Sequence, residues 1–394
     1  MPKKPLDVVI LDRELLRKVT DARTFIEAAV DGGMGVTYEI SGALKISRDS
    51  MNLIPGENSF VQCGDFSFKD YLPFSSRHRI ELDYVPLGIF SPFSHSIFGS
   101  NFEVHESSVD VSGGMSAALQ SMTTFDPMFS LHREKVVIDS AYPLDYSDDI
   151  VMPICGPGYP NFGHFLYDGL GLAVFLSMQN VQGLKFVGAA VRPWQTEIMK
   201  RLGIQERFFE INKPTRFRGI IASSMLYGHL PSPTRFIRPV FDLLRLTVGR
   251  SLDDPGKKIY ISRGEDKKRP IANREELELH MARRGYVVLN PDKLGLDETI
   301  QKMASARIVV GESGAGMANI GFCETGLQVL EIQRPGFMDG WTRATCDVMG
   351  FDWSVYLASD EQDLTGNASH HEARKIDIEK FSRAVDVVES RMSA

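Results

Sequence analysis

Apolar and polar residues alternate along the middle of the chain in blocks that predict strands and helices in turn. Apolar runs at 150–154, 184–187 and 217–227 predict strands. Residues 162–178, between the first two runs, place apolar side chains at a 3.6-residue period, which predicts a helix. Pro193 is suited to the first turn of a further helix. This alternation is typical of a parallel sheet covered by helices.

The same alternation resumes after a turn-rich stretch at 251–256, which we interpret as a domain boundary. A helix is predicted at 237–248, just before this boundary. Beyond it, apolar runs at 258–262, 286–289 and 308–310 predict strands. The second block is therefore expected to form a helix-covered parallel sheet of its own.

Capping signals define the two helices that are expected within the second block. Asn273 is followed three residues later by Glu276, which predicts a capping box, and Gly285 stands where this helix ends. Asp297 is predicted to cap a helix that runs through Met303. Helices between the predicted strands make this block a second Rossmann-like unit.

Three regions follow from these patterns. Residues 1–140 form a mixed region of short β-like runs and turns, which we expect to pack on the next domain and to face the acceptor. Residues 141–250 and 251–394 are the two Rossmann-like domains. Two such domains are expected to face a cleft, with ligands beyond the carboxyl ends of the strands. The predicted fold class is therefore α/β.

The segment 308–332 combines a strand pattern with residues suited to binding an anion. Its β-branched start is followed by Gly311, Gly314 and Gly316, and its second apolar run ends in Glu331. The order strand, glycine-rich turn, helix start, strand places free backbone N–H groups where a phosphate can bind. The segment is neither G-x-G-x-x-G nor a P-loop. From the residues alone, a phosphate cradle and an empty turn are equally supported.

Charged residues stand at two predicted strand ends. Arg263 directly follows the strand at 258–262, and Lys268 belongs to the basic loop behind it. Arg263 could neutralise a diphosphate through its planar fork, whereas a solvated turn is the alternative for the lysine. Glu331 could accept hydrogen bonds from paired ribose or sugar hydroxyls, or could form an ordinary ion pair.

His164 and Asp168 are four residues apart on the predicted helix 162–178, so they share one of its faces. An imidazole titrates near neutrality, and a carboxylate beside it can orient the ring or accept a proton itself. A local salt bridge at the start of the helix is the alternative, which the spacing alone favours. The sequence contains neither H-E-x-x-H nor D-x-D, so no metal site is predicted.

Composition limits the partners and the compartment. The net charge of −7 argues against a dedicated nucleic-acid binder. Four scattered cysteines without a C-x-x-C pair favour a reducing compartment, and the N-terminus lacks an apolar signal segment. We therefore expect a cytoplasmic protein, with a peripheral association at the inner face of the membrane left open.

Four segments follow one another along the chain: NFGHFLYDGL (161–170), RPWQTEIMKRLGI (192–204), IYISRGEDKKRPIANREEL (259–277) and VVGESGAGMANIGFCETGLQVLEI (309–332). Taken in order, they resemble glycosyltransferase family 61. The family includes bacterial capsule and exopolysaccharide proteins and eukaryotic xylosyl- and N-acetylglucosaminyltransferases. The resemblance implies a GT-B fold, a nucleotide-sugar donor held mainly by the C-terminal domain, a carbohydrate or glycoconjugate acceptor, and inversion without an essential metal or other cofactor.

The resemblance assigns roles to residues of this chain. The diphosphate is expected against the glycine turn, with Arg263 stabilising the charge of the leaving group, and Asp168 or His164 is expected to take the acceptor proton. With Lys268 added from the basic loop, the expected donor-binding residues are Arg263, Lys268, Asn273, Ser313, Gly314, Ala315, Gly316, Asn319 and Glu331.

One position departs from the family pattern. Ser313 stands where the family has a histidine before G-A-G, and Glu312 precedes it. A serine cannot carry the charge of an imidazolium, and an ionised Glu312 would repel a diphosphate. This departure leaves open a non-catalytic relative that binds nucleotide sugar or polysaccharide. A dinucleotide-dependent Rossmann enzyme is a further alternative, which the missing G-x-G-x-x-G motif disfavours.

Overall fold

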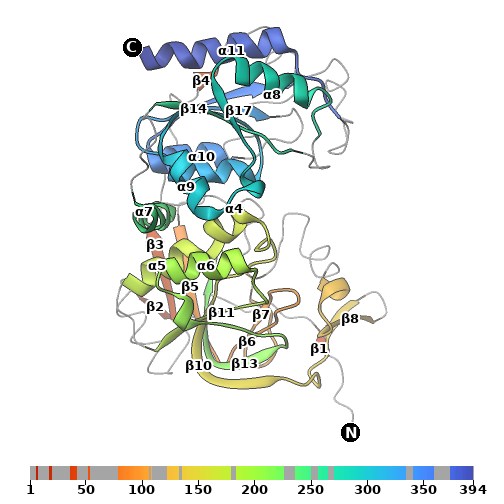
Figure 1. Cartoon of the computed structure of the whole chain (residues 1–394). Coiled ribbons are helices and arrows are strands. Elements are labelled where there is room, and N and C mark those ends of the chain that lie inside the picture. Colours follow the sequence, from red (N-terminus) through yellow and green to blue (C-terminus); the bar gives the residue numbers. More distant parts are fainter. Residues whose placement is uncertain are drawn as a thin grey trace. The chain divides into compact units, whose positions relative to one another are not determined.

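The structure is a computed structural model, and its mixed α/β elements fall into two compact units (Figure 1). Unit 1 comprises Met1–Ala43 and His78–Pro231, and unit 2 comprises Leu44–Arg77 and Ser232–Ala394. The α/β class predicted from the sequence is confirmed. The described residues are 6–7, 17–19, 36–41, 52–53, 79–105, 108, 122–132, 135–178, 183–225, 236–249, 256–264, 270–333, 340–358 and 373–393.

Unit 1 is built on a sheet in the order β12-β11-β10-β13-β5-β3-β2. The first four strands pair in parallel, as the alternating pattern predicted, and β5 joins β13 antiparallel. Strands β6 and β7 form a hairpin beside β13, and β1, β9 and β8 form a smaller sheet. The bounds are β1 Leu6–Asp7, β2 Arg17–Val19, β3 Val36–Ser41, β5 Arg79–Pro86, β6 Ile89–Phe90, β7 Ile97–Phe98, β8 Phe129–His132, β9 Lys135–Ile138, β10 Asp145–Pro153, β11 Leu184–Gly188, β12 Phe208–Glu210 and β13 Thr215–Ser223.

The helix predicted at 162–178 in unit 1 is confirmed, but it is not a regular α-helix. It consists of α4 Phe162–Phe165, the π-helical segment η5 Leu166–Leu170 and α5 Gly171–Met178. Helix α6, Pro193–Arg201, begins at its proline as predicted. Single π-helical turns within α-helices occur often at functional sites. The π-helical turn contains Asp168.

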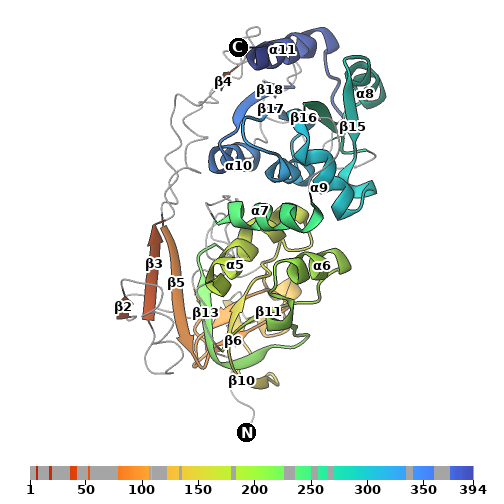
Figure 2. The same cartoon turned by 60° about the vertical axis from the view of Figure 1, so that its left-hand side comes forward.

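Unit 2 is built on a fully parallel sheet in the order β15-β14-β16-β17-β18-β4. Figures 1 and 2 show α8 and α11 on one face of this sheet and α9 and α10 on the other. The strands predicted from the apolar runs are confirmed, as is helix α7. The bounds are β4 Asn52–Leu53, α7 Ile237–Val248, β14 Lys257–Ile261, α8 Arg274–Arg283, β15 Tyr286–Leu289, η7 Pro291–Lys293, α9 Leu296–Ala304, β16 Ala306–Glu312, η8 Ala315–Phe322, β17 Gln328–Gln333, α10 Trp341–Met349, β18 Asp352–Leu357, α11 Ile378–Ser390 and η10 Arg391–Ser393.

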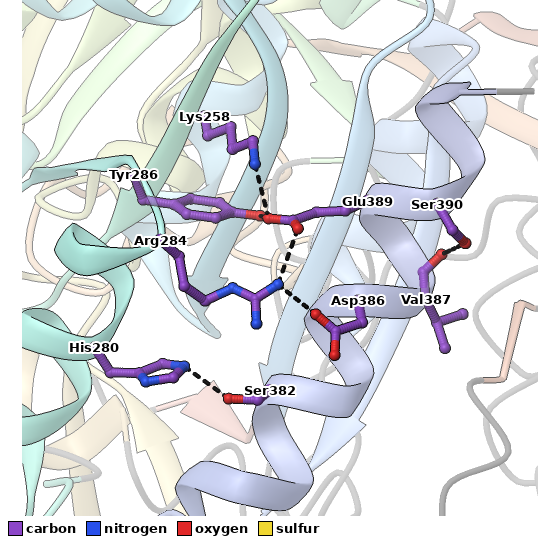
Figure 3. A network of polar contacts seen from close by, with 9 residues as sticks. All are labelled: Lys258, His280, Arg284, Tyr286, Ser382, Asp386, Val387, Glu389 and Ser390. Carbon is purple, nitrogen blue, oxygen red and sulfur yellow. Dashed lines mark hydrogen bonds and ion pairs between the residues drawn. The ribbon is translucent and has the colours of Figure 1, made fainter.

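A polar network holds α11 to the amino ends of β14 and β15 (Figure 3). The carboxylate of Glu389 accepts hydrogen bonds from Lys258 at 3.1 Å, Tyr286 at 3.0 Å and Arg284 at 2.9 Å. Arg284 also pairs with Asp386 at 2.5 Å. These contacts join the helix to the edge opposite the carboxyl ends of the strands, so we interpret them as structural.

Asn273 is the N-cap residue of α8, as predicted, whereas the predicted cap of α9 is corrected. Asn273 stands at the start of α8, but its side chain accepts no hydrogen bond from that helix. Its Oδ1 accepts from the backbone N–H of Ile376 at 2.8 Å and its Nδ2 donates to the carbonyl of Ile376 at 2.9 Å. Helix α9 is capped by Gly295, and Asp297 lies in its first turn, where a carboxylate still favours the helix dipole.

The helix start expected after the glycine turn is a 3₁₀ helix, η8. The Asn319 side chain donates to the carbonyl of Gly316 at 2.8 Å, an acceptor that the backbone of an α-helix would use. Gly321 packs on Phe241, since a Cβ there would lie 2.4 Å from the Phe241 ring. Within the ranges described above, no helix has both the length and the apolar character needed to cross a membrane.

Candidate active site

The candidate residues lie at the points where the strand order of each sheet reverses. In unit 1 the chain passes from β10 outward to β11 and β12 and then returns to β13 on the other side of β10. In unit 2 it passes from β14 to β15 and returns to β16. Ligands of open α/β sheets bind beyond the carboxyl ends of strands at such switch points. The loop after β10 leads to His164, and the loops after β14 and β16 carry Arg263 and Ser313.

His164 and Asp168 form one pair in the unit 1 site. The side chain of Asn161 caps α4 by accepting from the N–H groups of Gly163 at 2.9 Å and His164 at 3.3 Å. One helical turn later, Nδ1 of His164 lies 2.9 Å from Oδ2 of Asp168. The His164 side chain is 25% exposed. The spacing of four residues therefore brings the two groups together on one face, as predicted.

Asp168 is held in surroundings that favour its protonated form. The residue is only 5% exposed, and burial raises the pKa of its carboxyl group to about 6, although the hydrogen bond and charge of His164 act in the opposite direction. Its Oδ1 is buried, and no hydrogen-bond donor among the described residues reaches it. A carboxyl group with this pKa can release and accept a proton near neutral pH.

Two glycines hold this pair in place. A Cβ on Gly158 would lie 2.5 Å from Cγ of His164, so the glycine backbone lies directly against the imidazole ring. A Cβ on Gly169 would lie 2.5 Å from the carbonyl oxygen of Ile154, so the π-helical turn packs on the end of β10. Larger residues at either position would displace the ring or the helix.

The glycine turn of unit 2 is the accessible part of an otherwise buried segment. Gly314, Ala315 and Gly316 are partly exposed, and Gly314 has a φ of +143°, which favours glycine. The N–H groups of Ala315 and Gly316 have no acceptor within the described ranges. Nη1 of Arg263 donates to the carbonyl oxygen of Ser313 at 2.7 Å, which places the guanidinium beside this turn.

Glu312 lies just before this turn, but a cation compensates its charge. Nε and Nη2 of Arg274 donate to the two carboxylate oxygens of Glu312 at 3.2 and 3.0 Å. The Tyr260 hydroxyl donates to the same carboxylate at 3.3 Å. From the sequence alone, Glu312 was expected only to repel a diphosphate. Its pairing with Arg274 offsets that repulsion.

Glu331 occupies the interior of unit 2. It has 0% exposure, and its carboxylate accepts from Thr342 at 2.7 Å, from Gln333 at 2.8 Å and from the indole of Trp353 at 3.0 Å. These contacts tie β17 to α10 and β18. In this structure a donor hydroxyl does not have access to the carboxylate, so we correct its expected role from a donor contact to a structural one.

The other expected donor-binding residues are of two kinds: some have a structural role, and others surround the accessible glycine turn. Asn319 is buried, and its side chain donates a hydrogen bond to the carbonyl of Gly316 in the turn. The side chain of Asn273 is hydrogen-bonded to the backbone of Ile376. Both residues therefore stabilise the structure of the site. Arg263 and residues 313–316 surround the accessible turn. Lys268 lies outside the described residues.

A cavity of about 800 Å³ lies at the carboxyl ends of β14 and β15. Ser262 and Gly264, which flank Arg263 in the chain, belong to its wall, so it adjoins the switch point of unit 2. The sequence pattern did not predict this cavity, because its wall comes from several loops and the first turn of α8. Its lining is apolar, amide-bearing and charged with both signs: Ile271, Val288, Leu289, Leu294, Asn273, Asn290, Glu275, Glu276, Glu278, Arg274 and Lys293 are among the residues.

Comparison with protein families decides the assignment. Residues 162–330 match the family model described as Glycosyltransferase 61. This region is similar to family 61 glycosyltransferases. It extends from α4 to β17 and therefore contains both switch-point sites, and it confirms the resemblance read from the four segments. No curated protein matches the chain at a significant level.

The match to this family model is consistent with a glycosyltransferase, an enzyme that uses a sugar donor and an acceptor. Across the described residues, no three His, Cys, Asp or Glu side chains are grouped as metal ligands would be. The family 61 region carries every predicted catalytic residue, namely His164, Asp168 and Arg263. The structure places the first two in unit 1 and the third in unit 2.

Proposed function

We propose that this protein is an inverting, metal-independent glycosyltransferase of polysaccharide biosynthesis. It would move a sugar from a nucleotide-sugar donor to a hydroxyl of a carbohydrate or glycoconjugate acceptor. The observation that carries the proposal is that the family 61 region contains two strand-end sites with complementary chemistry. One holds a carboxyl group that titrates near neutrality, and the other presents a cation and free backbone N–H groups.

In this proposal the donor diphosphate binds to the turn of residues 314–316. The N–H groups of Ala315 and Gly316 donate to its oxygens, and Arg263 stabilises the negative charge that grows on the leaving diphosphate. The cavity beside the turn carries three glutamates together with the cations Arg274 and Lys293. Its apolar wall and amide groups fit the uncharged nucleoside of the donor, with glutamates available to ribose hydroxyls.

The acceptor is activated by the His164–Asp168 dyad. Inversion requires the acceptor oxygen to attack the anomeric carbon from the side opposite the leaving diphosphate, while a base removes the hydroxyl proton. The exposed imidazole can take that proton while Asp168 holds the ring and balances its charge, or Asp168 can take the proton itself. In either case the dyad must be in its basic form. The GT-B arrangement, in which two Rossmann-like domains serve one reaction, belongs to this proposal.

Ser313 favours a second candidate function. Because it stands where the family has a histidine, the protein could bind a nucleotide sugar or a polysaccharide without transferring the sugar. A thermal-shift screen with nucleoside diphosphates, nucleotide sugars and NAD identifies the ligand class. Release of nucleoside diphosphate that depends on both donor and acceptor then separates the transferase from the binding protein.

The role of Arg263 provides the direct test. We expect Arg263→Ala to lower turnover by about 10²- to 10³-fold, in the range measured when a transition-state hydrogen-bond donor is removed. Arg263→Lys should recover only part of this loss, because an ammonium group lacks the planar fork. Both variants should keep the near-UV circular dichroism spectrum of the folded protein. Turnover near the wild-type value in Arg263→Ala would remove Arg263 from the mechanism.

A further inference from the structure

His95 lies outside the family 61 region, in the turn between β6 and β7. The residue is buried and has a φ of +61°, a conformation that is costly for any residue with a side chain. Its Nδ1 lies 2.7 Å from the carbonyl oxygen of Cys155, so the ring must donate this hydrogen bond. Cys155 belongs to residues 154–161, hereafter the switch loop, which connects β10 to α4.

The switch loop is also held at Tyr159. The Tyr159 ring packs against the His95 ring with 5.3 Å between centroids. The Tyr159 hydroxyl donates to the carbonyl of Ala190 at 2.8 Å, and the carbonyl of Tyr159 accepts from Gln195 at 2.7 Å. His95 therefore contacts the loop at both Cys155 and Tyr159, on either side of the Gly158 backbone that lies against the His164 ring.

We propose that His95 is a positioning residue for the His164–Asp168 dyad. By fixing the switch loop at Cys155 and Tyr159, it holds Gly158 against the imidazole of His164 and so maintains the 2.9 Å contact with Asp168. This inference rests on the proposed function, because it gives the dyad its importance.

The chemistry of His95 suits a constant structural contact. Burial lowers its pKa to about 4, so the ring stays neutral at physiological pH and retains a proton for Cys155. A neutral ring adds no charge to the neighbourhood of the dyad. The strained backbone of His95 is then maintained by the hydrogen bond and the ring contact.

Two substitutions separate the hydrogen bond from packing. His95→Phe keeps an aromatic ring against Tyr159 but removes the donor, whereas His95→Gln retains an N–H donor. The control is His105→Gln, because His105 is another buried histidine of unit 1, 3.1 Å from Asp83. Each full-length variant would be labelled on its histidines, and the His164 ring signals would be assigned by their loss in His164→Ala.

We expect His95→Phe to shift or broaden the His164 ring signals and to lower kcat by about 10- to 100-fold, the range for a misplaced catalytic group. The KM for the donor should stay within about twofold, because the proposed donor contacts lie in unit 2. His95→Gln should restore the His164 signals and most of kcat. His105→Gln should leave the His164 signals unchanged.

Unchanged His164 signals in His95→Phe would overturn the proposal, as would equal effects of His95→Phe and His95→Gln. If His95→Phe does not fold, Tyr159→Ala at the half-buried end of the loop supplies the same test, and unchanged His164 signals there would equally overturn it. Should the protein prove to have no transferase activity, the ring signals of His164 still decide whether His95 positions it. Failure of the proposed function is thus distinguishable from failure of this inference.

Discussion

The two switch points each place a buried carboxyl group near the carboxyl ends of parallel strands, but they treat it differently. In unit 2, Glu312 receives two N–H groups from Arg274 and the hydroxyl of Tyr260. In unit 1, one oxygen of Asp168 contacts His164, and the other has no hydrogen-bond donor among the described residues. Burial is similar at the two sites, so the difference lies in the partners.

This contrast separates two chemical tasks. A site that binds an anion benefits when a nearby acid is neutralised, and Arg274 does this for Glu312. A site that removes a proton needs an acid whose charged form is not fully stabilised, because full stabilisation would lower its basicity. The incomplete hydrogen bonding of Asp168 meets that need. Each prediction below tests one side of this contrast.

The largest effect is expected for Asp168→Asn. An amide cannot serve as the base or balance an imidazolium, so turnover should fall by about 10²- to 10⁴-fold.

The same substitution should stabilise the protein. The folded-state pKa is raised from 3.8 to about 6, so wild-type stability falls as pH rises through this interval. Each pKa unit corresponds to ~1.4 kcal/mol, and the folded-state pKa is about two higher than the ordinary value. Asp168→Asn should therefore raise the free energy of unfolding by up to about 3 kcal/mol above pH ~6.

Urea unfolding at pH ~4 and ~7.5 measures this gain. The matched control is Glu312→Gln, which applies the same chemical change to the paired acid. It should lose stability, because it removes the carboxylate that Arg274 and Tyr260 bind. Stabilisation by both substitutions, or by neither, would mean that the partners of the two acids do not distinguish them.

The sequence could predict contacts that depend on local spacing or on strand order. His164 and Asp168 meet because four residues span one helical turn. Arg263 and Ser313 are 50 residues apart, yet both follow adjacent parallel strands, so they meet at one edge of the sheet. The pairing of Arg274 with Glu312 across 38 residues follows from no such rule. It depends on how a helix packs on the sheet.

Other features depended on packing that the sequence pattern does not encode. The π-helical turn around Asp168 keeps the same apolar period as an α-helix, so it could not be predicted. The sequence pattern placed Glu331 at a strand end, like a ligand-binding acid, but it lies inside β17 and Thr342 of α10 donates a hydrogen bond to it. In the N-terminal region, β5 extends the sheet by pairing with β13, more than a hundred residues later in the chain, and β3 and β2 follow it. Long-range antiparallel pairing of this kind leaves no local signal.

The second prediction removes the cation that compensates Glu312. Arg274→Met should lower the free energy of unfolding by about 3–5 kcal/mol, because it leaves a buried carboxylate without its partner. The double variant Arg274→Met with Glu312→Gln should recover most of this loss. Lys302→Ala, which breaks an exposed pair with Glu298 in the same unit, should cost at most about 0.5 kcal/mol. If Arg274→Met alone were as stable as Lys302→Ala, Glu312 would not need the positive charge of Arg274.

The third prediction concerns the pH dependence of turnover. Since the dyad acts in its basic form, kcat/KM should be constant above pH ~7 and fall about tenfold per unit below the pKa of about 6 that burial gives Asp168. The residual activity of Asp168→Asn should lack this acid limb. If kcat/KM of the wild-type protein instead fell with an apparent pKa near 3.8, the ordinary aspartate value, burial would not raise the pKa of Asp168.

The smallest effect is expected at the opposite edge of the unit 2 sheet, where Glu389 is an acid with three donors. Burial acts to raise the pKa of Glu389, but hydrogen bonds from Lys258, Tyr286 and Arg284 together lower it below its ordinary value of 4.5. Its contribution to stability is therefore fully present above that value and is lost as the pH falls through the lower folded-state pKa. Glu389→Gln should reduce stability at pH ~7 by about 1 kcal/mol, as for a partly exposed hydrogen-bonded ion pair.

The loss in Glu389→Gln should disappear in acid, where wild type also loses the charge. This is the reverse of Asp168→Asn, whose advantage disappears in acid. Unfolding curves of the two variants across pH ~3–8 should therefore diverge from wild type in opposite directions as the pH rises. Glu389 has a full set of hydrogen-bond donors, whereas Asp168 has an incomplete one. If the stabilities of the two variants changed with pH in the same direction relative to wild type, the number of donors would not determine how each acid makes stability depend on pH.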